Sequence, residues 1–428
     1  MRALVVGSGG REHALCWTLA RCASVAEVIA APGNPGIESV AQCMPVDAKD
    51  PAAIAQLADE VDADLVIAGS EETLVRGVVD TVKASGRLAF GPSAAAARLE
   101  GSKRWMKEIA AASEVPTARH GAFTADDEAA ALAFLETLGD LYVVKTDGLA
   151  AGKGVTVTES IEEARDAVRS YLSGAAFGDA GTTVVIEEGM RGPELSLLVV
   201  CNGDVRAATP LAPAQDFKRV GDGDAGPNTG GMGAYSPVPI AGDDVIDQVM
   251  DRAVRPTLRV LAEQGIEYRG ILYAGLMLTD EGPKLVEYNV RFGDPECQVV
   301  VPRLTTDLGE LCRAAASGEP LPDITFTDDS WVTIVLASER YPASPRTGDV
   351  IEGLDAEATL DDVVVFHAGT ARDDGKIVTA GGRVLNVTAS GATLGAARDR
   401  AYEAASRIEW PGMHYRRDIA ASAAGVPA

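Results

Sequence analysis

Two side chains near the end of a predicted strand have the chemistry of magnesium ligands. Glu287 and Asn289 are two residues apart in the run 284–290, and side chains at i and i+2 leave a strand on the same face. One carboxylate and one amide oxygen suit Mg²⁺, which keeps waters and takes its other oxygens from phosphates. Arg291 shares this face, where it would neutralise phosphoryl or carboxylate oxygens. A solvated edge strand explains Glu287 and Asn289 equally well, but the charged run that follows, 291–296, speaks against it.

A glycine-rich loop joins two predicted strands between Lys145 and Gly154. It contains a Gly-Lys pair, but Gly148 lies four residues before Gly152 instead of five, and Gly154 replaces the Ser/Thr of a P-loop. Because the loop also fails to open a helix, we interpret it as a flexible flap over a triphosphate. Lys145, at the end of a strand, would be a fixed cation beside it. A plain hairpin loop is the alternative.

A second glycine-rich turn, Gly7-Ser8-Gly9-Gly10-Arg11, lies between the first predicted strand and helix. Such a turn offers free N–H groups and a helix dipole to an anion. A dinucleotide is disfavoured, because Glu12 stands at the third glycine position and the second strand ends without an acidic residue. We expect the phosphate of a smaller ligand, with Gly33-Asn34-Pro35-Gly36 as another glycine turn at the same sheet edge. A turn needed only for packing is the alternative.

An acidic segment, Glu187-Glu188-Gly189-Met190, joins two predicted lobes. Ligand pockets favour such seams, where exposed backbone can pair with an adenine edge. Glu194, seven residues after Glu187, could accept ribose hydroxyls. Taken alone the signal is weak, because most acidic clusters are solvated surface.

The elements that must position these residues alternate strands with helices in the first hundred residues, which predicts a parallel sheet. A small α+β lobe is expected from 123 to 190, then a strand at 195–201, a loop-rich stretch at 209–240, a long helix at 243–263 and a hairpin at 271–290. From about Trp331 the chain is rich in strands and closes with a helix near 394–407. The remaining expected elements are strands at 3–6, 27–31, 65–68, 88–90, 141–145, 155–158 and 183–187 and helices at 12–21, 51–58, 103–112, 126–138 and 161–172.

Length and composition limit the class of protein. The 428 residues are enough for two to four domains, and no apolar stretch reaches the length of a membrane helix. A net charge of -25 argues against nucleic acid as a partner. We find no export signal, and the six cysteines are scattered without metal or disulfide spacing. We therefore expect reduced thiols and a cytoplasmic location.

Two longer strings carry a family resemblance. Residues 291–298 (RFGDPECQ) and 226–237 (GPNTGGMGAYSP) resemble the most specific motifs of the phosphoribosylamine–glycine ligases (glycinamide ribonucleotide synthetases), ATP-grasp enzymes of purine biosynthesis. The glycine turns, the flap and the terminal segment 412–419 also fit, so the resemblance covers essentially the whole chain. It implies an α/β ATP-grasp fold with an N-terminal Rossmann-like domain and a strand-rich C-terminal domain. The implied domains are 1–103, 104–190, 191–325 and 326–428.

The resemblance also implies site residues. It assigns ATP to Lys103, Lys145, Gly148, Gly152, Glu187, Glu188, Met190 and Glu194, Mg²⁺ or Mn²⁺ to Glu287 and Asn289, phosphoribosylamine to Gly9, Gly10, Arg11, Gly33, Asn34, Pro35 and Gly36, and catalytic roles to Arg291, Lys218, Asp216 and Asp294. Asp294 is expected to bind the glycine ammonium, and Asp216 competes for that role. Phe217 departs from the family pattern, which often has His there, as do Ser70 and Thr73, where prolines are frequent.

The implied reaction joins glycine to 5-phosphoribosylamine through glycyl phosphate, with ATP as co-substrate, and the flap would keep water from that intermediate. The implied protein is a monomer or weak homo-oligomer with no membrane partner. Three alternatives remain: another ATP-grasp ligase or a bicarbonate-using carboxylase subunit, a silent nucleotide-binding module, and an oxidoreductase. A silent module should have lost Lys145, Glu287 or Asn289, and all three are present.

Overall fold

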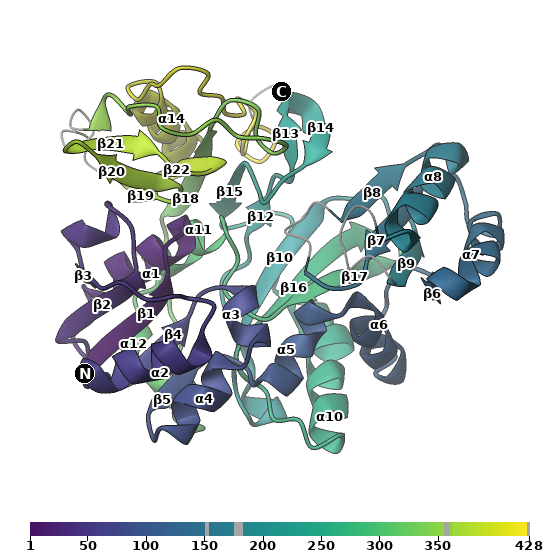
Figure 1. Cartoon of the computed structure of the whole chain (residues 1–428), viewed down its shortest axis with the longest axis horizontal. Coiled ribbons are helices and arrows are strands. Elements are labelled where there is room, and N and C mark those ends of the chain that lie inside the picture. The colour runs from purple at the N-terminus through teal and green to yellow at the C-terminus, as the bar shows by residue number, and fades with distance from the viewer. Residues whose placement is uncertain (150–153, 175–182, 355–359, 361, 426–428) are drawn as a thin grey trace.

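The computed structural model describes residues 1–149, 154–174, 183–354, 360 and 362–425. Its elements form an N-terminal α/β domain, a small lobe that projects to one side, and a large lobe continuous with a C-terminal sheet (Figure 1).

The N-terminal domain is a parallel sheet of order β3-β2-β1-β4-β5. Its elements are β1 (Arg2–Gly7), α1 (Gly10–Leu19), β2 (Glu27–Pro32), β3 (Gln42–Cys43), α2 (Pro51–Glu60), β4 (Leu65–Ala68), α3 (Glu71–Val75), α4 (Val78–Ala84), β5 (Leu88–Phe90) and α5 (Ala94–Gly101). β1 is covered on both faces, which is why its centre is wholly apolar. Leu4 and Val6 belong to the buried cluster that includes α2 and α4, and Ala3 and Val5 to the one that includes α1.

The carboxyl ends of β1 and β2 bring the two predicted glycine turns together. The Gly33 N–H donates to the Gly7 carbonyl oxygen at 3.1 Å. The expectation that both turns lie at one sheet edge is therefore confirmed.

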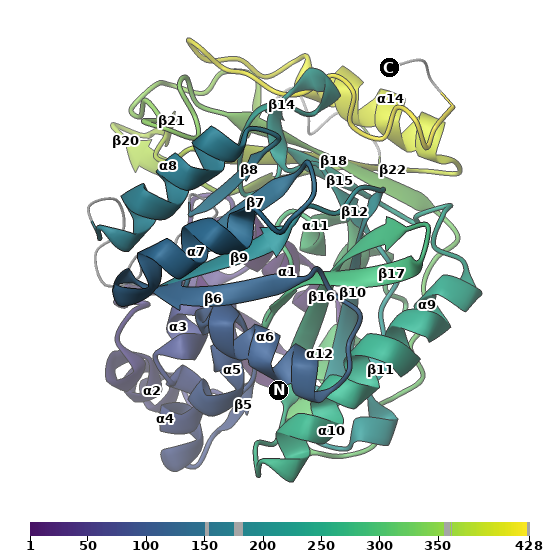
Figure 2. The ribbon, with the colours of Figure 1, turned by 90° about the vertical axis from the view of Figure 1, so that its right-hand side faces the viewer.

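The small lobe has a buried core of its own. Its elements are α6 (Lys103–Ala112), which leads into it, β6 (His120–Thr124), α7 (Glu128–Leu135), β7 (Tyr142–Thr146), β8 (Val155–Thr158), α8 (Ile161–Leu172) and β9 (Thr183–Glu188). The sheet is antiparallel, of order β6-β9-β7-β8, and α7 and α8 pack on it (Figure 2). Leu135, Val144, Val168 and Ile186 lie in this core.

The large lobe and the C-terminal domain share a sheet. The large lobe consists of β10 (Glu194–Asn202), β11 (Thr209–Pro210), β12 (Gln215–Asp216), β13 (Arg219–Gly221), β14 (Ala225–Asn228), β15 (Gly233–Ser236), α9 (Asp243–Val249), α10 (Arg255–Glu263), β16 (Arg269–Thr279), β17 (Gly282–Asn289), α11 (Cys297–Val300) and α12 (Leu308–Ser317). The C-terminal domain consists of β18 (Ser330–Ala337), β19 (Val363–His367), β20 (Thr370–Asp373), β21 (Lys376–Thr379), β22 (Arg383–Gly391) and α14 (Leu394–Ala405). One sheet is β11-β10-β16-β17, and the other, β12-β15-β18-β22-β19, joins the two parts.

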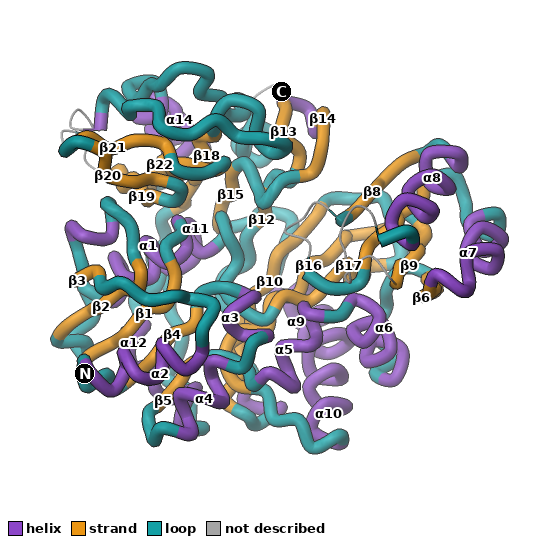
Figure 3. The backbone as a smooth tube through the Cα atoms, in the orientation of Figure 1, coloured by secondary structure: helices purple, strands orange, loops and turns teal. Residues whose placement is uncertain are grey.

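Three expectations about the elements need correction. The stretch 209–240 is not only loop, because it contains β11 to β15, of which Figure 3 labels β12 to β15. Pairing holds these segments, which are too short to show a period: β11 pairs with β10, β12 and β18 with β15, and β13 with β14. The long helix predicted at 243–263 contains a π-helical segment, Met250–Val254, between α9 and α10. The helix predicted at 126–138 begins with a 3-10 turn and ends at Leu135.

The composition predicts reduced thiols and no membrane helix. No helix in the described ranges is long and apolar enough to cross a membrane. All six cysteines carry free thiols, as their spacing predicted.

Candidate active site

A cavity of about 490 Å³ lies where the N-terminal domain, both lobes and the C-terminal domain meet. The predicted site residues in its wall are Arg11, Lys103, Asp216, Lys218, Glu287, Asn289, Arg291 and Asp294. The wall also holds residues that sequence reasoning missed, among them Glu71, Glu100, Tyr341 and Arg383. The other predicted site residues that the structure describes lie outside this wall.

The candidate metal ligands leave β17 together, as predicted. Tyr288 between them turns to the opposite face, where its hydroxyl donates to the Ala253 carbonyl oxygen at 3.0 Å. Burial alone would raise the pKa of Glu287, but the nearby lysines, Lys145 foremost, hold that pKa below its usual range. Glu287 is therefore ionised, as a ligand must be. Within the described residues no group of three or more His, Cys, Asp and Glu side chains could hold a metal, so this place offers one carboxylate and one amide.

Arg291 is bound by two carboxylates from the N-terminal domain. Its Nε lies 3.1 Å from Glu71 Oε2, and its Nη2 lies 2.8 Å from Glu100 Oε1. Arg291 is the main cause that lowers the pKa of Glu71 to about 2, whereas burial raises the pKa of Glu100 to about 7. Arg291 is thus fixed between domains, with Nη2 also 3.3 Å from Asn289 Oδ1.

Ser70 explains how Glu71 is placed. The Ser70 hydroxyl accepts the Thr73 N–H at 3.3 Å and caps α3, while the Thr73 hydroxyl donates to the Ala48 carbonyl oxygen at 2.9 Å. A serine followed by two acids is a recognisable start of a helix. The two departures from the family pattern, at positions 70 and 73, therefore form a helix cap. This sequence signature indicates that Glu71 begins a helix at this place.

Glu187 is buried between two lysines. Its Oε1 lies 3.0 Å from Lys145 Nζ and 3.3 Å from Lys107 Nζ. Burial lowers the pKa of Lys107 to about 8. The Glu187 side chain therefore holds Lys145 in place and is not free for an adenine base. Sequence reasoning missed Lys107, which looks like an ordinary helix-surface lysine.

The backbone after Glu187 is partly used within the protein. The Glu188 N–H donates to the Arg119 carbonyl oxygen at 2.9 Å, and the Gly189 N–H to that of Leu141 at 2.7 Å. Met190 follows Gly189 directly in the chain.

Two further cations have partners in the site. Lys218 pairs with Glu194 and, at 2.9 Å, with Asp216 Oδ1. Burial opposes the charge of Lys218, but both carboxylates raise its pKa well above the usual value. Lys103 donates to the Gly148 carbonyl oxygen at 2.9 Å, which ties α6 to the start of the predicted flap. Gly152 lies outside the described residues.

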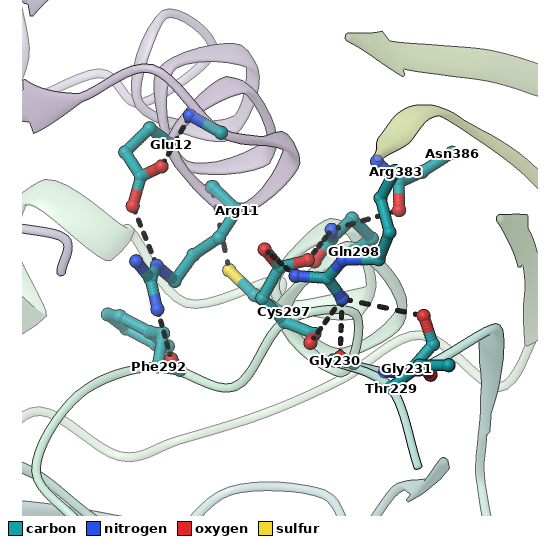
Figure 4. A network of polar contacts seen from close by, with 12 residues as sticks. Arg11, Glu12, Thr229, Gly230, Gly231, Phe292, Cys297, Gln298, Arg383 and Asn386 are labelled. Atoms are coloured by element: carbon teal, nitrogen blue, oxygen red, sulfur yellow. Dashed lines mark hydrogen bonds and ion pairs between the residues drawn. The ribbon is translucent and has the colours of Figure 1, made fainter. Parts of the chain in front are cut away.

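The N-terminal turn holds an internal carboxylate. Glu12 Oε2 accepts the Gly9 N–H at 2.7 Å, and Glu12 Oε1 lies 2.7 Å from Nε of the buried Arg11 (Figure 4). Arg11 also donates to the Phe292 carbonyl oxygen at 3.2 Å. The acid at the third glycine position thus takes up the Gly9 N–H, a donor that the turn of a dinucleotide fold would offer to pyrophosphate.

The second glycine turn is organised by Asn34. Its Nδ2 donates to the carbonyl oxygens of Ser8 and His367, both at 2.8 Å. Its Oδ1 accepts the N–H groups of Gly36 at 2.9 Å and Ile37 at 3.0 Å. The Asn34 side chain therefore joins the two glycine turns to the C-terminal domain.

Asp294 shares its carboxylate between two side chains. Oδ2 lies 2.8 Å from Arg383 Nη2, and Oδ1 accepts Gln298 Nε2 at 2.7 Å. Burial would raise the pKa of Asp294, but Arg383 and Arg11 lower it. Asp294 is thus an ionised group beside the N-terminal turn.

Three family models match the chain in series. They describe the N domain, the ATP-grasp (A) domain and the C domain of phosphoribosylglycinamide synthetase and match residues 1–100, 101–297 and 331–422. The phosphoribosylamine–glycine ligase of Mesorhizobium japonicum is 50% identical over 420 residues, which are 98% of this chain and 97% of that protein. That of Streptomyces coelicolor is 49% identical over 430 residues and covers both chains fully.

Solved structures agree with these matches. The crystal structure of phosphoribosylamine–glycine ligase from Thermotoga maritima has a TM-score of 0.83 and 34% identity, covering 98% of this chain and all of that one. The biotin carboxylase domain of Hydrogenobacter thermophilus 2-oxoglutarate carboxylase, in complex with MgADP, covers 96% of this chain and 91% of its own. Its TM-score is 0.72, and at 17% identity it shows the shared fold alone. The predicted ATP-grasp fold is confirmed, and the chain belongs to the phosphoribosylglycinamide synthetase family.

Proposed function

We propose that this protein uses ATP to join glycine to 5-phosphoribosylamine, giving N1-(5-phosphoribosyl)glycinamide, ADP and phosphate in purine biosynthesis. The observation that carries the proposal is the cavity, which brings Lys103, Lys218 and Arg291 to the same space as the Glu287 carboxylate. All substrates carry negative groups, and the described cavity wall sets five cationic side chains against six carboxylates, a far less negative balance than the net charge of -25 for the whole protein. The family membership agrees with this reaction.

The first step forms an acyl phosphate. A carboxylate oxygen of glycine attacks the γ-phosphorus of ATP, and the bond from that phosphorus to the β-bridging oxygen breaks to release ADP. Lys103, Lys218 and Arg291 offset the charge that gathers on the phosphoryl oxygens. Lys145 lies outside the cavity wall and contributes a positive charge that Glu187 holds in place.

The second step forms the amide. The amine nitrogen of phosphoribosylamine attacks the carbonyl carbon of glycyl phosphate, phosphate leaves, and the nitrogen gives up a proton. The turns at Gly9-Gly10-Arg11 and Gly33-Asn34-Pro35-Gly36 would hold the phosphoribosyl group, with the Arg11 guanidinium in the cavity wall. Asp294 or Asp216 would bind the glycine ammonium, each once it gives up part of its present ion pair.

Glu287 and Asn289 would hold Mg²⁺ or Mn²⁺, which neutralises phosphate charge when bound. The ionised, cavity-facing carboxylate beside an amide oxygen fits such an ion. Adenine would lie along Glu187 to Met190, with ribose at Glu194. We place the protein in the cytoplasm as a monomer or weak homo-oligomer, in keeping with its free thiols.

The test is ADP formation with each substrate omitted in turn. We expect ADP release only when glycine, phosphoribosylamine, ATP and Mg²⁺ are present together, since the acyl phosphate is formed for transfer. Phosphoribosylamine can be generated in the assay from ribose 5-phosphate and ammonia. ADP release that follows bicarbonate without glycine would instead indicate a carboxylase.

A pair of variants on one hairpin refines this test. Glu287→Ala should lower turnover at saturating Mg²⁺ by about a hundredfold or more, since it removes the only proposed carboxylate ligand. Glu281→Ala is the matched control, because Glu281 lies in the exposed turn of the same hairpin and pairs only with Lys284 among the described residues. Unchanged turnover of Glu287→Ala would refute the metal assignment.

A further inference from the structure

Arg383 connects the two strings that carry the family resemblance. It begins β22 in the C-terminal domain, and its side chain is only 20% exposed. Nη2 lies 2.8 Å from Asp294 Oδ2, and Nη1 donates to the Asp294 carbonyl oxygen at 2.8 Å. Nη1 also donates to the Gly230 carbonyl oxygen, as Figure 4 shows. Nη1 is also 3.5 Å from the Gly231 carbonyl oxygen, so one guanidinium holds a carboxylate and three backbone carbonyls from two other segments.

The glycines of one string are needed for this arrangement. A β-carbon built on Gly230 would lie 3.0 Å from the Arg383 guanidinium carbon. At Gly231, where φ is +106°, a β-carbon would lie 2.4 Å from Pro295. Side chains at these positions would therefore push Arg383 and Pro295 away. The Gly230-Gly231 pair is shaped to receive Arg383 on one side and the Asp294-Pro295 segment on the other.

The held carboxylate lies in the cavity wall beside the N-terminal glycine turn. A β-carbon on Gly9 would be 3.8 Å from Asp294 Oδ2, so Asp294 borders the turn that we assign to phosphoribosylamine. Lys103, Gly154 and Glu287 line the same cavity and belong to the proposed ATP site. Arg383 therefore acts on the acceptor end.

We propose that Arg383 is a positioning residue for the acceptor half of the reaction, which aligns Asp294 and the Gly230-Gly231 turn against phosphoribosylamine. This inference rests on the proposed function, with Asp216, the competing candidate, at the glycine ammonium and Asp294 at the acceptor. Arg383 uses two separate nitrogens, Nη2 for the carboxylate and Nη1 for the backbone carbonyls, so it fixes direction as well as charge, whereas the ammonium of lysine has a single nitrogen. Without Arg383 the Asp294 carboxylate would lose its principal cation and rotate.

The test compares phosphoribosylamine with ATP by steady-state kinetics. For Arg383→Met we expect the KM for phosphoribosylamine to rise at least about tenfold and kcat to fall, while the KM for ATP stays within about twofold. Arg383→Lys should show an intermediate effect. It also keeps the inference testable if the methionine variant does not fold, as judged by thermal unfolding.

Arg372→Met is the matched control. Arg372 also belongs to the C-terminal domain and pairs with Glu38 of the N-terminal domain at 2.9 Å, but it is not in the cavity wall. Its kinetics should equal those of the unmodified protein. If Arg372→Met reproduced the change, or if Arg383→Met raised the KM of ATP and phosphoribosylamine equally, Arg383 would be a structural tie only and the inference would be wrong.

A double variant tests whether Arg383 acts through Asp294. Adding Arg383→Met to Asp294→Asn should change the KM for phosphoribosylamine by less than about threefold beyond Asp294→Asn alone. If the two substitutions instead multiplied their separate effects on this KM, Arg383 would not act through Asp294. Absence of glycine- and phosphoribosylamine-dependent ADP formation in the unmodified protein would instead overturn the proposed function itself.

Discussion

Four of the five cationic side chains in the described cavity wall already have an acidic partner, and the fifth, Lys103, donates to the Gly148 carbonyl oxygen. Lys218 is bound by Asp216 and Glu194, and Arg291 by Glu71 and Glu100. Buried charges must be paired, so these contacts keep the site stable without ligand. An arriving phosphate or carboxylate therefore shares cations that are already oriented. The pairing also explains how a protein of net charge -25 presents positive groups to anionic substrates.

The pair of Glu71 with Arg291 should appear as a pH-dependent contribution to stability. The folded pKa of Glu71 is about 2, below its ordinary value of 4.5, so its contribution is complete above pH 4.5 and lost as pH falls toward 2. Glu71→Gln should therefore lower the free energy of unfolding by about 2 kcal/mol at pH 7, and the difference should shrink below pH 4.5. Urea unfolding at several pH values measures this.

Glu72→Gln is the control for that experiment. Glu72 is the next residue of α3, but its partners Lys49 and Arg76 are exposed, so its loss should cost less than about 0.5 kcal/mol. A constant difference between Glu71→Gln and the unmodified protein from pH 7 to pH 3 would contradict the assignment.

At the scale of elements, the two glycine turns depend on one amide. Asn34→Asp keeps the acceptor oxygen for Gly36 but places a carboxylate oxygen against the carbonyls of Ser8 and His367. We expect a loss of about 2 kcal/mol or more in the free energy of unfolding, measured by chemical denaturation. Ser39→Ala, in the same turn but exposed, should change it by less than about 0.5 kcal/mol. Equal effects of both variants would show that the amide has no special role.

The sequence predicted helices and strands well, but it predicted contacts between distant segments poorly. The helix at 161–172 and the strand at 155–158 occur as expected because their periods are local. Ser70 and Glu71 lie outside any such period, and β15 is too short to show one. The position of β15 depends on a pairing partner far along the chain, β18, and the contact of Glu71 with Arg291 likewise joins segments that are remote in sequence. Spacing correctly placed Glu287 and Asn289 on one face, since two residues on one strand need no tertiary information.

The same reason explains the missed site residues. Arg383 follows Gly381-Gly382, which indicate only a turn, and its partners Gly230 and Asp294 are remote in sequence. Lys107 stands on a helix with nothing nearby in sequence to suggest Glu187. Sequence identified the strings that surround the site, but not the side chains that join them.

At the scale of the molecule, the small lobe should open independently. Its core is a separate cluster, whereas the other two clusters each draw on the N-terminal domain, the large lobe and the C-terminal domain. Leu135→Ala, a fully buried change in the small lobe, should cost about 2–5 kcal/mol locally. Native-state hydrogen exchange should show faster exchange in β6 to β9 and unchanged exchange in the N-terminal sheet.

Leu336→Ala is the matched control in a large cluster. It should speed exchange in the C-terminal sheet and spare the small lobe. Uniform acceleration by Leu135→Ala across the molecule would show that the lobe is not a separate unit.

The place of Arg383 in the chain has a consequence for synthesis. Among the described residues of the cavity wall it is the last to leave the ribosome. A nascent chain therefore contains the proposed ATP-binding residues before it contains the side chain that aligns the acceptor end. Domains that emerge first can fold first, so a partly made chain could bind nucleotide yet lack the means to transfer an acyl group. Competence for the complete reaction would arise only when β22 adds to its sheet, near the end of translation.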